Sequence, residues 1–370
     1  MQISTLIRRE LPGDAYIFNL ADPAERAAFS AHPEELIRIC RSMPKREEPW
    51  FVFIDEAQTV PDIFNAVQVL FDEDRESRRI ILCGSSARKL RTSGANLLPG
   101  RSIQYSLFPL TSPEYLSIGI EGFPVASVLA QGSLIPALRA SEPETGRTVA
   151  VESFPFRSLE DRLLFGDLPG IAATESPSER RDVLKTYVTA HLEEEIRRET
   201  ALREWGAFLR FLAFAAAESG SVLNLKAISR ESGLSAPTIR SHYQLLEDMF
   251  LGFMLPAFSG SPRKSVLSSP LFEQWVGIEL YKRLRYLGEG RVCYFRTSGG
   301  AEVDFIVERG GRLSPIEVKW TEHPGLSDAR HLLSFMKDHP DKSDHGYVVC
   351  RCKYPQALAQ NITAIPWWGL

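Results

Sequence analysis

Short apolar runs alternate with amphipathic segments through the first hundred residues of the chain. Four runs have the length and composition of buried strands: Ala15–Leu20, Trp50–Ile54, Ile80–Cys83 and Ile103–Leu107. Between them, residues 33–43 and 63–71 repeat apolar side chains at helical spacing. Apolar strands that alternate with helices are typical of a parallel sheet. The pattern therefore predicts an α/β fold for this part of the chain.

After Pro109 the pattern becomes helical and then mixed. Residues 139–158 lack periodicity and predict a loop, whereas residues 181–218 predict helices. Residues 225–231 and 236–250 predict two short helices joined by a turn, with Ser235 as the N-cap of the second. This is the layout of a helix-turn-helix. The last third of the chain, from about residue 261, returns to mixed helices and strands.

The composition is that of a soluble globular protein. The chain has 370 residues, of which 44% are hydrophobic and 24% charged, so two or three domains are expected. No apolar run reaches the roughly 18 residues that a membrane span requires, and no signal peptide is evident. The five cysteines show no metal-binding spacing, and a cytoplasmic location is expected. The net charge of −4 gives no global case for nucleic-acid binding.

Two adjacent acids, Asp55 and Glu56, end the apolar run at residues 50–54. This is the Walker B arrangement of P-loop proteins, in which the first acid holds Mg²⁺ and the second orients a water molecule. Ser85 follows the next strand and could sense the γ-phosphate. The alternatives are a solvated strand end for the acids and an ordinary turn for Ser85. The Gly-Lys step of a phosphate-binding loop is absent from the chain.

A predicted hairpin near the C-terminal end gathers charged side chains. Gly310 and Gly311 suit a two-residue turn, which pairs Arg309 with Arg312. That register places Asp304 opposite Glu317 and Glu302 opposite Lys319, with all four on one face. Facing carboxylates repel, and a divalent cation would remove that cost.

The residue types of this hairpin match the core of a PD-(D/E)xK nuclease-like site. Asp304 and Glu317 would hold Mg²⁺, and Lys319 would position or help to ionise the water. Glu279, on the preceding predicted helix, would be an additional metal-binding acid. The alternative is a solvated face with cross-strand ion pairs.

The helix-turn-helix offers few contacts to a nucleic acid. Its acidic and basic residues balance, and the predicted recognition helix contributes chiefly Arg240 and His242. A structural role that packs the two ends of the chain together is the alternative to DNA binding.

Several of these motifs together resemble a prokaryotic family of AAA-type P-loop ATPases with a C-terminal domain of unknown function of the PD-(D/E)xK class. The resemblance rests on these segments: Asp55–Gln58, Cys83–Ser86, Leu97–Arg101, Phe108–Thr111 with Glu114, Phe165–Pro169, Leu271–Leu280 and Glu302–Phe305. It implies ATP and Mg²⁺ as ligands and Arg101 as a finger acting in trans. Ser4 and Thr5 align with the end of the Walker A loop, where Gln2 and Ile3 replace Gly-Lys.

The expected architecture has four parts. They are an AAA-type core without Walker A at residues 1–118, a helical connector at 119–218, a winged helix-turn-helix at 219–260 and a nuclease-like domain at 261–370. The predicted function is a nucleotide-dependent switch with impaired ATP turnover, acting on nucleic acid or a partner protein and compatible with homo-oligomers. The alternatives are a catalytically inactive DNA- or protein-binding module and a metal-dependent nuclease.

Overall fold

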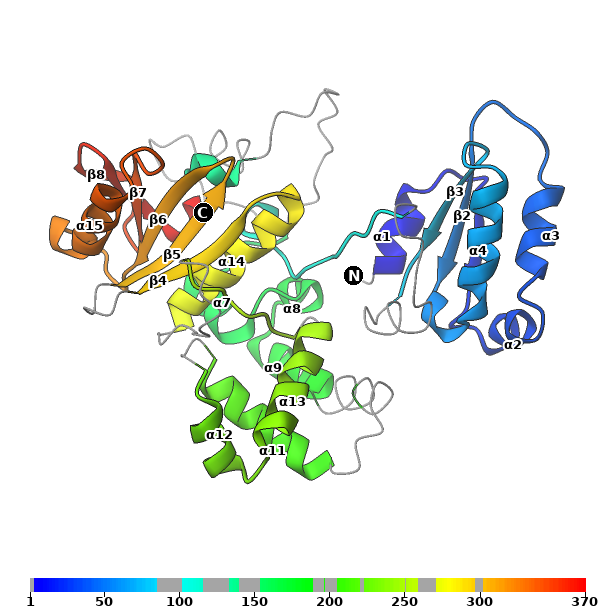
Figure 1. Cartoon of the computed structure of the whole chain (residues 1–370), viewed down its shortest axis with the longest axis horizontal. Coiled ribbons are helices and arrows are strands. Elements are labelled where there is room, and N and C mark those ends of the chain that lie inside the picture. Colours follow the sequence, from blue (N-terminus) through cyan, green and yellow to red (C-terminus); the bar gives the residue numbers. More distant parts are fainter. Residues whose placement is uncertain are drawn as a thin grey trace. The chain divides into compact units, whose positions relative to one another are not determined.

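The structure is a computed structural model that forms two compact units (Figure 1). It describes residues 3–84, 102–115, 133–139, 154–188, 196, 205–219, 223–249, 251–258, 271–296 and 302–370. The first unit comprises Met1–Leu107, Glu195–Ala201 and Tyr243–Phe253, and the second comprises the remainder. Within the described residues, every helix is too short or too polar to cross a membrane.

A parallel three-stranded sheet forms the centre of the first unit, with β2 between β1 and β3. Its strands are β1 (Tyr16–Asn19), β2 (Trp50–Asp55) and β3 (Arg78–Leu82). Its helices are α1 (Ile3–Glu10), α2 (Pro23–Ala31), α3 (Glu35–Ser42) and α4 (Asp62–Glu73). Three of the four predicted strands and both predicted helices are therefore confirmed.

The fourth predicted strand, residues 103–107, is wrong. The segment is not a strand, and the side chains of Ile103 and Tyr105 are 78% and 84% exposed. A strand needs a neighbour that takes up its backbone hydrogen bonds, and no described strand pairs with this segment. The first regular structure after it is a short 3-10 turn, Ser112–Glu114.

Side chains alternate along β2 and place its last residue near α1. Val52 and Ile54 pack with Leu36 of α3 and Val67 of α4. Asp55 has the opposite parity and therefore points to the other face. Figure 1 shows α1 across the sheet from α4. The Ser4 hydroxyl of α1 donates to Asp55, so Asp55 points to the face that α1 covers.

The middle of the chain is helical, as the sequence predicts. Its described helices are α7 (Leu159–Phe165), α8 (Pro169–Ala173), α9 (Pro177–Thr186), α11 (Trp205–Ala217), α12 (Leu225–Ser232) and α13 (Ala236–Asp248). Gly233 ends α12 with a φ of 71°, and the Ser235 hydroxyl accepts a hydrogen bond from the amide of Thr238 at 3.3 Å. Residues 251–258 form one bridge, Ala257 to Tyr294, rather than a hairpin, so the wing stays a prediction.

A mixed six-stranded sheet in the order β4-β5-β6-β7-β9-β8 forms the C-terminal part of the second unit. Its elements are α14 (Leu271–Leu287), β4 (Arg291–Arg296), β5 (Glu302–Arg309), β6 (Arg312–Val318), α15 (Arg330–Asp338), β7 (Gly346–Cys350), β8 (Gln356–Ala359) and β9 (Ile362–Pro366). Helices α14 and α15 belong to separate hydrophobic clusters, which pack on the two faces of the sheet (Figure 1).

The predicted hairpin between β5 and β6 is confirmed. Gly310 and Gly311 have φ values of 57° and 76°, and Arg309 pairs with Arg312. The register continues without a shift to the pair Phe305 and Ile316. The positive φ angles of both turn residues are those of the predicted turn, which explains the two consecutive glycines.

Candidate functional site

Asp55 lies at the end of the central strand β2 and is 5% exposed. Its Oδ1 accepts hydrogen bonds from the Ser4 hydroxyl of α1 at 2.9 Å and from the amide of Glu56 at 3.1 Å. Its Oδ2 lies 3.5 Å from Nη2 of Arg8. The fold thus brings two predicted ligands, Ser4 and Asp55, into direct contact across 51 residues of sequence.

The thiol of Cys83, at the end of β3, lies close to the same group. Burial and the neighbouring charges of Asp55 and Glu56 raise the pKa of Cys83 to about 12. Thr5 is exposed in the first turn of α1. The predicted γ-phosphate sensor Ser85 and the predicted finger Arg101 lie outside the described residues.

A second charged group lies where β5 and β6 stop pairing. Two residues of β5, Asp304 and Phe305, oppose the single residue Tyr294 of β4, which is a β-bulge. Beyond the bulge, the amide of Val318 donates to Oδ2 of Asp304 at 2.7 Å instead of to a strand carbonyl. Nζ of Lys319 donates to Oε1 of Glu317 at 2.7 Å. Asp304, Glu317 and Lys319 therefore lie together, but the predicted strand pairs Asp304–Glu317 and Glu302–Lys319 do not form, because the pairing of β5 with β6 ends at Phe305 and Ile316.

The electrostatics of this group are those of crowded, buried acids. Burial and the nearby charge of Glu317 raise the pKa of Asp304 to about 7. Burial raises the pKa of Glu317 as well, although Lys319 opposes that shift. Burial by itself lowers the pKa of Lys319, but the bond to Glu317 raises it above its ordinary value. Glu302 pairs with Arg296 on β4, with 3.7 Å between Nε and Oε2.

The additional acid near this group is Glu273 rather than Glu279, which corrects the sequence prediction. Burial and the charge of Asp304 raise the pKa of Glu273 to about 9. Glu279 lies almost two turns further along α14 and binds other residues. The prediction chose the wrong acid because it fixed no rotational position for α14 against the sheet.

In this conformation, the described part of the chain has no group of three or more His, Cys, Asp or Glu side chains that could hold a metal ion. One observation still favours a cation. Oε2 of Glu317 is buried without a hydrogen-bond partner among the described residues. An orphaned, buried carboxylate oxygen is costly unless a cation or a proton neutralises it.

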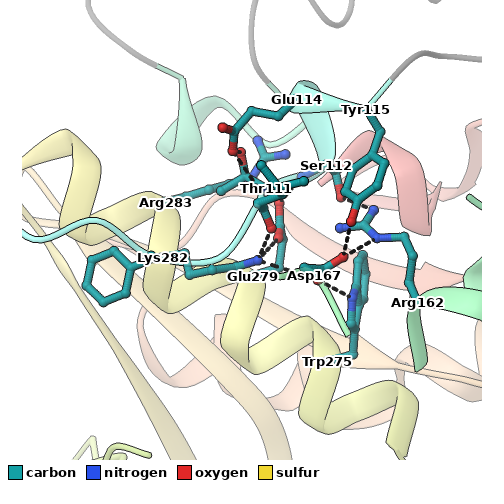
Figure 2. Close-up of polar contacts among 12 residues, drawn as sticks. Thr111, Ser112, Glu114, Tyr115, Arg162, Asp167, Trp275, Glu279, Lys282 and Arg283 are labelled. Carbon is teal, nitrogen blue, oxygen red and sulfur yellow. Dashed lines mark hydrogen bonds and ion pairs between the residues drawn. The ribbon is translucent and has the colours of Figure 1, made fainter. Parts of the chain in front are cut away.

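Glu279 belongs to a third group, the buried charge cluster (Figure 2). We define this cluster as Arg162, Asp167, Glu279, Lys282 and Arg283, which are all at most 8% exposed. Each of the three cations pairs with Asp167, with Glu279 or with both. Arg162 lies on α7, Asp167 on the loop after it, and the other three on α14.

Ion pairs join the five side chains of the buried charge cluster to one another. Glu279 pairs with Lys282 at 3.0 Å and with Arg283 at 3.0 Å. Asp167 pairs with Arg162 at 2.7 Å and with Lys282 at 3.6 Å. Burial by itself would raise the pKa of Glu279, but the two cations of α14 hold it far below its ordinary value.

The cluster also holds the segment from Phe108 to Tyr115. The amide of Ser112 donates to Glu279 at 2.7 Å, and Lys282 donates to the carbonyl of Leu110. The hydroxyl of Tyr115 donates to Asp167 at 3.0 Å. Figure 2 shows these side chains converging from the segment, α7 and α14. The motifs around residues 108–114, 165–169 and 279 are separate in the sequence, and only the fold shows that they form one structure.

His242 does not face solvent, which corrects its prediction as a nucleic-acid contact. It is 6% exposed, and its ring lies 5.0 Å from that of Phe208 and 4.9 Å from that of Phe211, both on α11. Burial lowers the pKa of His242 below its ordinary value. The prediction failed because His242 lies on the buried side of α13. Arg240, on the same helix, is exposed.

Three protein families match successive parts of the chain. Residues 2–116 match a family described as an AAA domain, so this part of the chain is related to P-loop NTPases. Residues 156–270 and 268–370 match two families described as domains of unknown function, DUF8612 and DUF4143. AAA domains typically bind ATP and Mg²⁺.

The similar proteins are uncharacterized bacterial proteins. The uncharacterized protein Rv2008c of Mycobacterium tuberculosis is 23% identical over 78% of this chain and 62% of its own length. An uncharacterized protein of Haemophilus influenzae is 25% identical over 58% of this chain and 47% of its own length. The chain thus spans less than two thirds of these relatives. Protein VC1899 from Vibrio cholerae, a crystal structure, is 12% identical over 86% of this chain and 87% of its own, with a TM-score of 0.20, which supports no statement about the fold.

Proposed function

We propose that the first unit is a nucleotide-dependent switch that binds MgATP and hydrolyses it slowly. The observation that carries the proposal is the 2.9 Å hydrogen bond between Ser4 and Asp55. In P-loop NTPases a hydroxyl at the start of a helix and an acid at the end of a strand hold the magnesium ion together. The match of residues 2–116 to an AAA domain supports the same assignment.

The residues present fit a magnesium ion. The hydroxyl of Ser4 and the buried carboxylate of Asp55 are oxygen ligands, which Mg²⁺ prefers. When bound, the ion neutralises charge on the phosphates. Glu56 lies next to this pair and would orient the attacking water and accept its proton.

The residues before Ser4 give the reason for slow turnover. Gln2 and Ile3 stand where the Walker A motif has Gly-Lys. Glutamine and isoleucine both lack the positive charge with which that lysine stabilises the β- and γ-phosphates. Binding through magnesium would persist, while stabilisation of the transition state would be weaker.

A titration of the full chain with MgATP, followed by calorimetry, tests the proposal. We expect micromolar binding, and Asp55→Ala should weaken it about tenfold or more because it removes a carboxylate ligand of the ion. Asp62→Ala is the matched control, since Asp62 is an exposed acid nearby in sequence on α4. Absence of heat with the wild-type chain, or equal binding by Asp55→Ala, would refute the proposal.

The switch is proposed to act on a nucleic acid or on a partner protein. The exposed Arg240 on α13 supports a nucleic acid, because an arginine on the second helix of a helix-turn-helix can reach the major groove. The remaining charges of α12 and α13 nearly balance, so the case for a nucleic acid rests on Arg240 and not on the net charge of the two helices.

The acids beside the β-bulge of β5 favour a second candidate function, a metal-dependent nuclease. The observation behind it is the buried oxygen of Glu317 that lacks a partner beside Asp304 and Lys319. Asp304 and Glu317 would hold a divalent cation, with Glu273 nearby as a third acid. Lys319 would position the water or stabilise the charge that develops on it.

Thermal unfolding with MnCl₂ and nicking of plasmid DNA test this candidate separately. Mn²⁺ at about 100 times its dissociation constant should stabilise the chain by about 2.7 kcal/mol. Asp304→Asn should abolish both the stabilisation and the nicking. Lys319→Met should abolish only the nicking, because it removes no metal ligand.

The control for this experiment is Glu308→Gln, which changes an acid on the same strand that pairs with Arg291 instead. It should leave both measurements unchanged. If Mn²⁺ stabilises Asp304→Asn as much as the wild type, the cation does not bind at the bulge.

A further inference from the structure

Glu56 has an unusual backbone conformation at the candidate nucleotide site. Its φ is 52°, and it is the only residue other than glycine with a positive φ in the part of the chain that the structure describes. This conformation costs roughly 1–2 kcal/mol for a residue with a side chain. The backbone on both sides of Glu56 is fixed, because Asp55 and Ala57 hydrogen-bond to the residues that directly follow β1 and β3. The carbonyl of Asp55 accepts from Leu20 at 3.1 Å, and the amide of Ala57 donates to Cys83 at 2.9 Å.

The side chain of Glu56 is held as well. Nε2 of Gln58 donates to Oε2 of Glu56 at 2.5 Å. Gln58 lies in the 3-10 turn Ala57–Thr59 and is 7% exposed, whereas Glu56 is partly exposed. A buried amide is thus directed at one oxygen of a carboxylate that reaches solvent. Hydrogen bonds to ionised groups are shorter and stronger than neutral ones, so this bond restrains the carboxylate.

We infer that Gln58 is a positioning residue that holds the Glu56 carboxylate ready to orient the attacking water. The inference rests on the proposed nucleotide hydrolysis and goes beyond it by assigning a role to a second buried side chain. A strand end that only needed solvation would require neither a left-handed residue nor a buried amide bound to its acid. Strained backbone of this kind persists where the surrounding structure fixes it, and it is common at functional sites.

Steady-state hydrolysis of MgATP by full-chain variants tests the inference. Gln58→Met keeps the length of the side chain and removes the donor. We expect kcat to fall roughly 10- to 100-fold with little change in KM, because a misplaced catalytic group slows the reaction without weakening binding. In a Glu56→Gln background, Gln58→Met should cause no further loss, since the two residues would act as one unit.

Thr59→Val is the matched control. It removes a hydrogen bond from the same turn to the backbone oxygen of Glu56, at 2.8 Å, and does not touch the carboxylate. It should lower thermal stability slightly and leave kcat unchanged. An equal fall in kcat for Thr59→Val and Gln58→Met would mean that Gln58 only stabilises the turn, and it would overturn the inference.

The remaining outcomes separate the inference from the function beneath it. If calorimetry detects no MgATP binding, the proposed nucleotide site is wrong and the inference falls with it. If MgATP is bound and hydrolysed and kcat is unchanged in Gln58→Met, the proposed function stands and the positioning role is overturned. If the wild type binds MgATP without hydrolysing it, the nucleotide site stands, but the proposed hydrolysis and the positioning role are both overturned.

Discussion

Glu279→Ala is expected to destabilise the second unit by about 3–5 kcal/mol, the largest effect of any single substitution considered for this chain. The substitution leaves Lys282 and Arg283 as buried cations with one carboxylate fewer between them. It also leaves the amide of Ser112 without its acceptor. Removal of one partner from a buried ion pair is costly because the remaining charge stays out of water. Calorimetric unfolding of the full chain measures the effect.

The control for Glu279→Ala is Glu308→Ala. Glu308 pairs with Arg291 at 2.7 Å, but both side chains are at least one-third exposed. The loss should be below about 1 kcal/mol, since water screens such a pair. Equal destabilisation by the two substitutions would show that the buried charge cluster contributes no more than a surface ion pair.

The effect of Glu279→Ala should depend on pH. Cations hold the pKa of Glu279 below the ordinary value of 4.5, so the folded state favours the ionised form. The stability that Glu279 contributes is therefore complete above pH 4.5 and is lost as the pH falls through the lowered pKa. The difference between wild type and Glu279→Ala should narrow in acid.

Glu273→Gln is expected to stabilise the second unit by roughly 1–3 kcal/mol at pH 8. Burial and the charge of Asp304 raise the pKa of Glu273 from 4.5 to about 9. An acid whose pKa is higher in the folded state stabilises the fold below pH 4.5, and this contribution is lost as the pH rises to about 9. Glutamine has the same shape and no charge, so the variant does not lose this stability as the pH rises.

Unfolding of Glu273→Gln by urea at pH 5 and pH 8 measures this effect. The gain over wild type should be small at pH 5 and larger at pH 8. Glu289→Gln is the control, because Glu289 is 56% exposed and pairs with Arg309, away from Asp304. Lower stability of Glu273→Gln at pH 8 would show that the charged form of Glu273 is favourable in the fold.

Local chemistry explains the parts of the structure that the sequence predicts correctly. The hairpin register follows from two glycines that both require positive φ, together with the alternation of side chains along a strand. The end of β2 follows from an apolar run that stops at two acids. The start of α13 follows from the hydroxyl of Ser235, which accepts a backbone hydrogen bond.

Three predictions failed because they depended on partners far away in the sequence. Residues 103–107 have the composition of a strand, but no described strand lies beside them. His242 is a residue type that often contacts nucleic acids, but α11 covers its side chain. Glu279 and Glu273 are equivalent as acids on one helix, and the position and rotation of α14 against the sheet determine which of them lies near Asp304.

The sequence alone therefore determines the strands, turns and caps whose causes lie within a few residues, and the chemical types present at each strand end. The tertiary structure decides which of those groups meet. Ser4 reaches Asp55 across 51 residues, Ser112 reaches Glu279 across 167, and the amide of Val318 donates to Asp304 across 14. Such contacts depend on how helices and strands pack, because burial and charge pairing depend on the whole surroundings of a side chain rather than on its neighbours in the chain.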